Sequence, residues 1–252
     1  VDMDWASYAG KRRQLPWHLL AALLLASHGS RVLMHGTDTG TPGRIYLPQA
    51  LAALGLAPAE SCAEAAHQLA QNRFAYLPLE SFSPILQSML DLKSVLGLRS
   101  PVHTLVRMLN PFRAQASLVG IFHPGYDDTH QQAGLLLGDA YLAAFKGEGG
   151  EPERNPDAPC SVRLLREGQA MTQDWPVLFD RRHLRDETLD CNRLHRVWRD
   201  EEEDEYGTAA IIGTAAIALT AQGSAPDPEQ ALAEASRLWV TRDRHFLESF
   251  RN

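Results

Sequence analysis

The chain has 252 residues, of which 44% are hydrophobic and 22% charged, a composition typical of a globular protein with one large core. Its longest aliphatic run, residues 19–26, is too short to cross a bilayer, and its net charge of −7 argues against a polyanion as partner. The charge is uneven, however: residues 1–126 carry ten Lys or Arg against seven Asp or Glu, and residues 127–252 carry fourteen against twenty-four. The first half can therefore still form a basic surface.

Helical and strand patterns alternate along the chain, as an α/β sheet requires. The chain starts directly on what reads as a first strand and its loop. Pro16 opens a helix that Gly29 closes, and residues 31–35 follow as a buried strand. Ser61 and Glu64 have capping-box spacing at the start of the next helix. Further strands are predicted at 74–77, 117–122, 141–146 and 160–165, and further helices at 82–96, 131–137, 209–221, 228–239 and 241–250.

The cysteines and histidines do not form a metal-binding pattern. Cys62, Cys160 and Cys191 are an odd, scattered set, and the histidines, among them His35 and His103, lack ligand spacing. No signal-peptide pattern precedes the first predicted helix, so we expect a cytoplasmic protein.

Four segments carry the most specific signal, and in this order they resemble the anthranilate phosphoribosyltransferase family. They are residues 32–36 (VLMHG), 93–111 (KSVLGLRSPVHTLVRMLNP), 119–124 (VGIFHP) and 147–153 (GEGGEPE). The resemblance spans nearly the whole chain. It implies an α/β fold of the nucleoside phosphorylase/phosphoribosyltransferase type, with flanking helices and a small helical subdomain that includes parts of residues 47–110. It also implies a homodimer formed through the helical part, and N-terminal helices that we expect to be absent from this chain.

The first departure from the family concerns its diphosphate site. The resembling enzymes hold a diphosphate with the backbone N–H groups of a Gly-rich turn after the first strand. The matching residues 2–13 lack this turn, and the bulky Trp5 and Tyr8 stand in place of glycines. We therefore expect side chains to fill the space that the diphosphate needs.

The second departure concerns magnesium, which those enzymes hold with an adjacent Asp-Glu pair after a Gly-Gly turn. Gly149 and Gly150 keep the turn, but the matching pair is Pro152 and Glu153. Proline cannot ligate a cation through its side chain. Glu153, with Glu151, is therefore only a weak metal candidate beside the simpler interpretation of a solvated acidic turn, and we expect no magnesium and no cofactor.

The acceptor half of the substrate site has also changed. Lys93 stands where the enzymes have an arginine that helps to hold the anthranilate carboxylate, so it keeps the charge and loses the bidentate fork. The family's Lys-His-Gly-Asn run reads Met-His-Gly-Thr at residues 34–37. We expect loss of the original reaction and a vestigial substrate site made of His35, Gly36, Lys93, Arg99, Asn110, Gly149 and Gly150.

The chain keeps the segments of the family but lacks the residues that bind the diphosphate. In this combination it resembles the YbiB-type bacterial branch, whose members bind nucleic acid without sequence preference. Residues 4–13, 97–101 and 149–156 resemble that branch. Binding of this kind needs clustered cations on phosphates and little contact with base edges. The cations predicted to share one groove are Lys11, Arg12 and Arg13, the densest cluster in the chain, with Lys146, Arg154 and Arg163.

Two hypotheses follow. The first is a noncatalytic, sequence-independent DNA- or RNA-binding protein, in which Trp5 and Tyr8 stack on bases or, more simply, are buried. The alternative is a glycosyl or phosphoribosyl transferase with an altered substrate, favoured by the retained His35, Arg99 and Asn110. Three adjacent cations such as those at 11–13 also occur on ordinary solvated loops, which is the simplest interpretation of that cluster.

Overall fold

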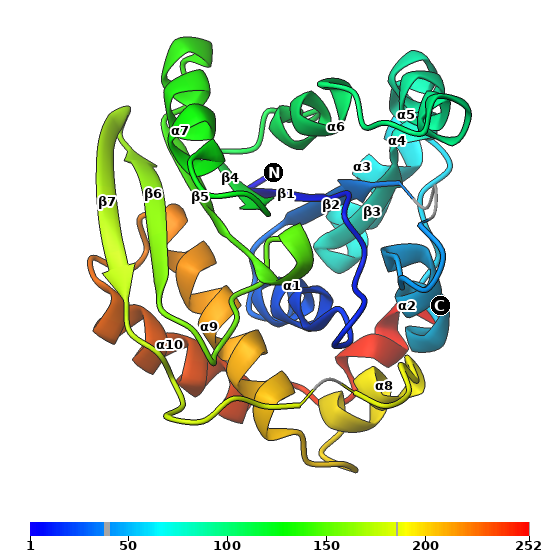
Figure 1. Ribbon diagram of the computed structural model, residues 1–252. Coiled ribbons are helices and arrows are strands. Elements are labelled where there is room, and N and C mark those ends of the chain that lie inside the picture. Colours follow the sequence, from blue (N-terminus) through cyan, green and yellow to red (C-terminus); the bar gives the residue numbers. More distant parts are fainter. Residues whose placement is uncertain (38–40, 185, 252) are drawn as a thin grey trace.

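The computed structural model describes residues 1–37, 41–184 and 186–251, and within them one seven-stranded sheet runs through the molecule in the order β3-β2-β1-β4-β5-β6-β7 (Figure 1). Strands β1 to β5 are parallel, and β6 and β7 are antiparallel additions at one edge. The strands are β1 (Met3–Ser7), β2 (Val32–Gly36), β3 (Phe74–Pro78), β4 (Ala116–Ile121), β5 (Tyr141–Lys146), β6 (Cys160–Arg166) and β7 (Gln169–Trp175).

The helices lie on both faces of this sheet. They are α1 (Trp17–Ser27), α2 (Leu47–Leu54), α3 (Cys62–Asn72), α4 (Leu79–Phe82), α5 (Pro84–Leu96), α6 (Val102–Leu105), α7 (Tyr126–Leu137), α8 (Asn192–Trp198), α9 (Glu205–Ala221) and α10 (Pro228–Thr241), with the 3-10 turns η1 (Val106–Met108), η2 (Glu148–Gly150) and η3 (Phe246–Arg251). The predicted α/β sheet with flanking helices is confirmed. None of the described helices has both the length and the apolar content needed to span a membrane.

Three parts of the chain differ from the prediction. The hairpin strand β7 and the short helix α8 were not predicted, and residues 241–245 do not continue into a helix. Strand β7 reads QAMTQDW and exposes most of its side chains at the sheet edge, so its hydrophobic signal is weak. It follows β6 through a tight turn in which Glu167 and Gly168 both have positive φ, the geometry of a two-residue hairpin.

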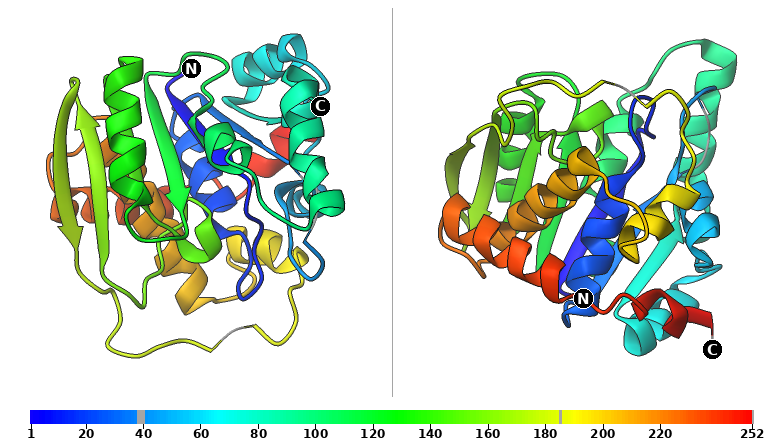
Figure 2. Two further views of the ribbon diagram at one scale, coloured as in Figure 1. Left: turned by 45° about the horizontal axis from the view of Figure 1, so that its top comes forward. Right: turned by 90° about the horizontal axis from the view of Figure 1, so that it is seen from below.

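Alternation along β1 decides where its side chains lie. Helices α1 and α9 cover one face of the sheet (Figure 2). Met3 and Trp5 belong to the main hydrophobic core together with residues of these two helices. Trp5 is fully buried there, within the strand and in register with Met34. The expectation that Trp5 fills the loop after this strand, or stacks on a base, is therefore wrong.

The opposite face of β1 carries the elements that build the site. Ala6 and Tyr8 pack there with Leu79, Leu90 and Val106, which come from α4, α5 and η1. These short helices lie at the carboxyl ends of β1 and β2, apart from α8–α10 (Figure 1). In open parallel sheets the carboxyl ends of the strands are where ligands bind.

Candidate functional site

The turn after β1 and the turn around Gly150 close over each other. Glu151 is 1% exposed, and its Oε1 accepts hydrogen bonds from the backbone N–H groups of Ala9 (2.6 Å) and Gly10 (2.5 Å). Gly150 has a φ of +90°, and a Cβ there would lie 3.1 Å from that of Phe122. The backbone N–H groups that follow β1 therefore bind a carboxylate of the protein itself.

Lys11 lies beneath this closure and is not at the surface. Its side chain is 0% exposed, and its Nζ lies 2.7 Å from Glu148 Oε2 and 2.5 Å from Glu153 Oε1. Burial opposes the charge on Lys11, but the two carboxylates outweigh it and raise the pKa of the ammonium. The second oxygen of Glu153 accepts a hydrogen bond from the backbone N–H of His18 (2.9 Å). Lys11 is therefore a buried structural cation, and its predicted place in a nucleic-acid groove is wrong.

Arg154 is likewise buried, so its prediction as a groove residue is also wrong. Its guanidinium donates to the carbonyl of Pro176 and lies 5.2 Å from the ring centroid of Trp175. Arg163 is partly exposed and forms an ion pair with Asp127 at 3.3 Å. Among the predicted groove cations, Arg12, Arg13 and Lys146 are exposed.

The predicted metal candidates are already engaged. Glu151 binds two backbone N–H groups, and Glu153 binds Lys11 and His18. The described part of the chain contains no group of three or more His, Cys, Asp or Glu side chains placed to hold a metal ion. The residues at this turn therefore do not fit the magnesium site that the fold family implies.

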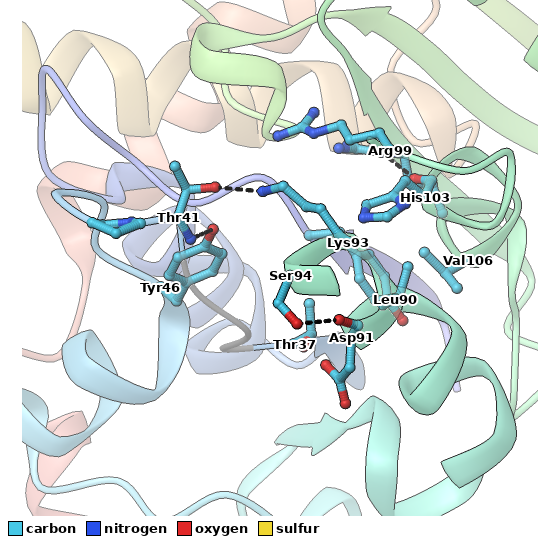
Figure 3. A pocket seen from close by; sticks show the side chains of 13 residues that line it. Thr37, Thr41, Tyr46, Leu90, Asp91, Lys93, Ser94, Arg99, His103 and Val106 are labelled. Carbon is cyan, nitrogen blue, oxygen red and sulfur yellow. Dashed lines mark hydrogen bonds between the residues drawn. The ribbon is translucent and has the colours of Figure 1, made fainter. Parts of the chain in front are cut away.

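A cavity of about 480 Å³ opens between the turn after β1 and the short helices (Figure 3). Lys93 reaches from α5 across this cavity to the hydroxyl of Thr41, at 2.9 Å. Arg99 and Arg107 line the same space. The other lining residues are Tyr8, Thr37, Pro42, Tyr46, Leu90, Asp91, Ser94, His103 and Val106.

Two of the three cations in this cavity have neutral hydrogen-bond partners. Lys93 donates to Thr41, and Arg107 donates to the carbonyl oxygens of Gly120 (2.8 Å) and Gly150 (2.7 Å). Among the described residues, none of the three cations forms an ion pair with a carboxylate, although Asp91 lines the cavity. Burial, together with the charges of Arg99, Lys93 and Arg107, lowers the pKa of His103. The cavity is therefore electropositive.

The predicted vestigial residues divide into two groups. Lys93 and Arg99 line the cavity. His35 is buried between Tyr8 Oη (2.8 Å from Nδ1) and Asp4 Oδ2 (3.1 Å from Nε2), so it holds Tyr8 against the sheet.

Gly36 and Asn110 shape the backbone near the site. A Cβ at Gly36 would lie 2.0 Å from the carbonyl oxygen of Ser7. Asn110 bonds the backbone N–H and carbonyl of Ala114 and closes a turn. Gly36 and Asn110 therefore determine the local backbone conformation near the site.

A second cavity, of about 500 Å³, shares Arg99, His103 and Arg107 with the first. Its other wall is aromatic and comes from the residues that follow β4, Phe122, His123 and Tyr126. The sequence analysis used residues 119–124 as part of a resemblance and interpreted His123 as a framework residue, but it gave no role to Phe122, Tyr126 or Arg107. The sequence signal for these rings is the occurrence of several aromatic residues directly after a buried strand.

The comparisons with known proteins agree with the observed fold. The chain is 28% identical over 165 residues to the uncharacterized protein YbiB of Escherichia coli strain K12, a match that covers 64% of this chain and 51% of that protein. It is 31% identical over 151 residues to the anthranilate phosphoribosyltransferase of Oleidesulfovibrio alaskensis, covering 59% of this chain and 44% of the enzyme. The crystal structure of anthranilate phosphoribosyltransferase from Thermus thermophilus superposes with a TM-score of 0.79 at 23% identity, covering 98% of this chain and 76% of that one.

The chain is anthranilate phosphoribosyltransferase-like in sequence and in fold. No family model matches it, and the matches span about half the length of these two curated relatives. On the anthranilate phosphoribosyltransferase-like fold, the turn after β1 corresponds to the segment that the sequence resemblance assigns to the diphosphate. In this chain the N–H groups of that turn bind Glu151 instead.

Proposed function

We propose that the chain is a noncatalytic nucleic-acid-binding protein whose phosphate contacts lie in the cleft of Lys93, Arg99 and Arg107. This site differs from the groove predicted from sequence, because Lys11 and Arg154 are buried. The observation that carries the proposal is the contrast between two neighbouring regions. The turn that the family resemblance assigns to the diphosphate is closed by the protein's own carboxylate, and the cleft beside it keeps three cations that form no ion pair with a carboxylate among the described residues.

The closed turn argues against phosphoribosyl transfer. A diphosphate would have to displace Glu151 from the N–H groups of Ala9 and Gly10, and so leave a carboxylate that is 1% exposed without these donors. The nearby Glu153 already has Lys11 as its cation and is not free to hold the metal that would neutralise a leaving diphosphate. Both changes remove stabilisation of charge in the transition state, a contribution of several kcal/mol in enzymes of this kind.

The open cleft favours an anionic ligand with several charges. Arg99 is exposed and Lys93 is partly exposed, so a phosphate can approach both without unfolding any element. Contacts of this type carry no sequence information, because they reach the backbone of the nucleic acid and not the edges of its bases. We therefore expect affinity that is independent of sequence and falls steeply with salt, with a slope of about −0.7 per phosphate neutralised on a single strand.

The experiment is a fluorescence-anisotropy titration of a labelled 20-nucleotide strand at several salt concentrations, with Arg99→Glu as the test variant. Arg99→Glu should weaken binding to strands of any sequence alike and flatten the salt slope by about 0.7 for the phosphate contact that is lost. The matched control is Arg237→Glu, which makes the same change of charge on the exposed face of α10, where Arg237 pairs with Glu234. Equal affinity and equal slope in wild type and Arg99→Glu would refute this site.

The alternative function is transfer to an altered acceptor. The buried chain Asp4–His35–Tyr8 favours it, because it places a tyrosine hydroxyl supported by a histidine in the wall of the first cavity. Under this alternative, phosphoribosyl pyrophosphate should bind with magnesium, and Tyr8→Phe should reduce turnover while the fold is kept. Nucleic-acid binding without any such ligand binding supports the first proposal.

A further inference from the structure

The aromatic wall of the second cavity is unusually exposed for rings that follow a buried strand. Phe122 is 53% and Tyr126 48% exposed, whereas Ile121, the last residue of β4, is buried. Phe122 and His123 pack edge to face with their ring centroids 4.9 Å apart, and His123 lies 6.4 Å from Tyr126. Three rings from one short segment therefore line the wall of one cavity.

Cationic side chains also line this cavity. Arg99 and Arg107 line both cavities, so the aromatic wall lies next to the proposed phosphate contacts. The volume of the second cavity, about 500 Å³, falls within the range of small-molecule sites, about 300–1,000 Å³. Its lining therefore combines aromatic rings with guanidinium groups.

His130 lies in the wall of this cavity. It is 2% exposed, and its Nδ1 lies 2.6 Å from the carbonyl oxygen of Tyr126, to which it donates. Its Nε2 has no partner among the described residues. Burial lowers the pKa of His130. Its Nε2 is itself buried, so it is not presented to a ligand in the cavity.

We propose that Phe122 and Tyr126 form a base-stacking subsite, so that the nucleic acid bound in the cleft is single-stranded. This inference rests on the proposed function and adds the class of ligand to it. A base in a duplex is already stacked on its neighbours and presents only its edges, whereas an unpaired base can place its ring face on an aromatic side chain. Every base has such a face, so stacking here keeps the binding independent of sequence.

The test compares three ligands of equal length: a thymidine 12-mer, a blunt 12-base-pair duplex, and a 12-mer strand in which every base is replaced by an abasic site. Wild type should bind the thymidine strand more tightly than the abasic strand, by roughly 5- to 150-fold for each stacked base. Phe122→Ala and Tyr126→Ala should each remove most of this difference and leave binding of the abasic strand unchanged. Phe122→Trp should retain it.

The control variant is Leu136→Ala, which truncates an exposed side chain at the far end of the same helix, α7. It should leave all three affinities unchanged, and circular dichroism should show the same fold for every variant. Equal binding of the thymidine and abasic strands by wild type would refute the stacking subsite but would not contradict the proposed phosphate contacts. Binding of none of the three ligands at low salt would overturn the proposed function, and the subsite with it.

Discussion

Replacement of Lys11 by methionine should destabilise the protein strongly, although its neighbours at 12 and 13 are exposed. The change removes the cation that Glu153 and Glu148 share and leaves Glu153, which is 0% exposed, buried with one partner fewer. Two charge-assisted hydrogen bonds are lost, each contributing about 1.5–3 kcal/mol. Removal of one partner from a buried ion pair costs about 3–5 kcal/mol, a range that agrees with this sum.

For a chain of 252 residues, 1 kcal/mol corresponds to about 2–4 °C in the unfolding midpoint, so we expect Tm to fall by about 6–20 °C. Scanning calorimetry of wild type, Lys11→Met and Arg12→Met checks this value, and Arg12→Met should change the free energy of unfolding by at most about 0.5 kcal/mol. The double variant Lys11→Met/Glu153→Gln should recover part of the loss, because no charge is then buried alone. A Tm for Lys11→Met within about 2 °C of wild type would show that Lys11 is not the buried partner of Glu153.

Two further predictions concern pH and assembly. Burial opposes protonation of His183, but its hydrogen bonds to Asp157 (2.7 Å) and Glu205 (3.2 Å) outweigh this effect and raise the pKa of the imidazole. The stability that His183 contributes is therefore present below about pH 6.5 and is lost as the pH rises through the raised pKa. The free energy of unfolding by urea should therefore differ between wild type and His183→Gln at pH 5.5 and converge at pH 9; a difference that is the same at both pH values contradicts this role. Helix α5 exposes Ile85, Met89, Leu92 and Val95, an apolar stripe that we expect to lie in a homodimer interface. Sedimentation equilibrium should detect dimers that Leu92→Glu dissociates, and wild-type monomer alone at micromolar concentrations would count against pairing through α5.

Much of the fold follows from local patterns in the chain. Apolar runs of strand length mark β2 to β6, and the helix predicted at 209–221 is the inner part of α9, which packs against α1 and the sheet. Helix α9 begins where local chemistry favours a helix start, because Asp204 is its N-cap and accepts from the N–H of Gly207. These features depend on neighbours in sequence, and for that reason they could be predicted.

The site depends on contacts between distant parts of the chain, and there the prediction was weaker. Lys11 was assigned to the surface because three adjacent cations are usually solvated. Its ion-pair partners, Glu148 and Glu153, lie far along the chain, so no local pattern indicated them. Its inward position follows from the pairing of its backbone with Ile45, a contact that no local pattern marks. Lys93 and Arg99 were found because they belong to a segment that resembles a family, and Arg107 in the same segment had no recognisable role without the cavity.

Calorimetry on one protein sample with two ligands tests the central claim most directly. We predict measurable heat and saturable binding with a single-stranded 20-mer at low salt, and no heat with phosphoribosyl pyrophosphate in the presence of magnesium, because Glu151 occupies the N–H groups of Ala9 and Gly10. Saturable, magnesium-dependent binding of phosphoribosyl pyrophosphate, with no binding of the 20-mer, would contradict the claim and identify a transferase.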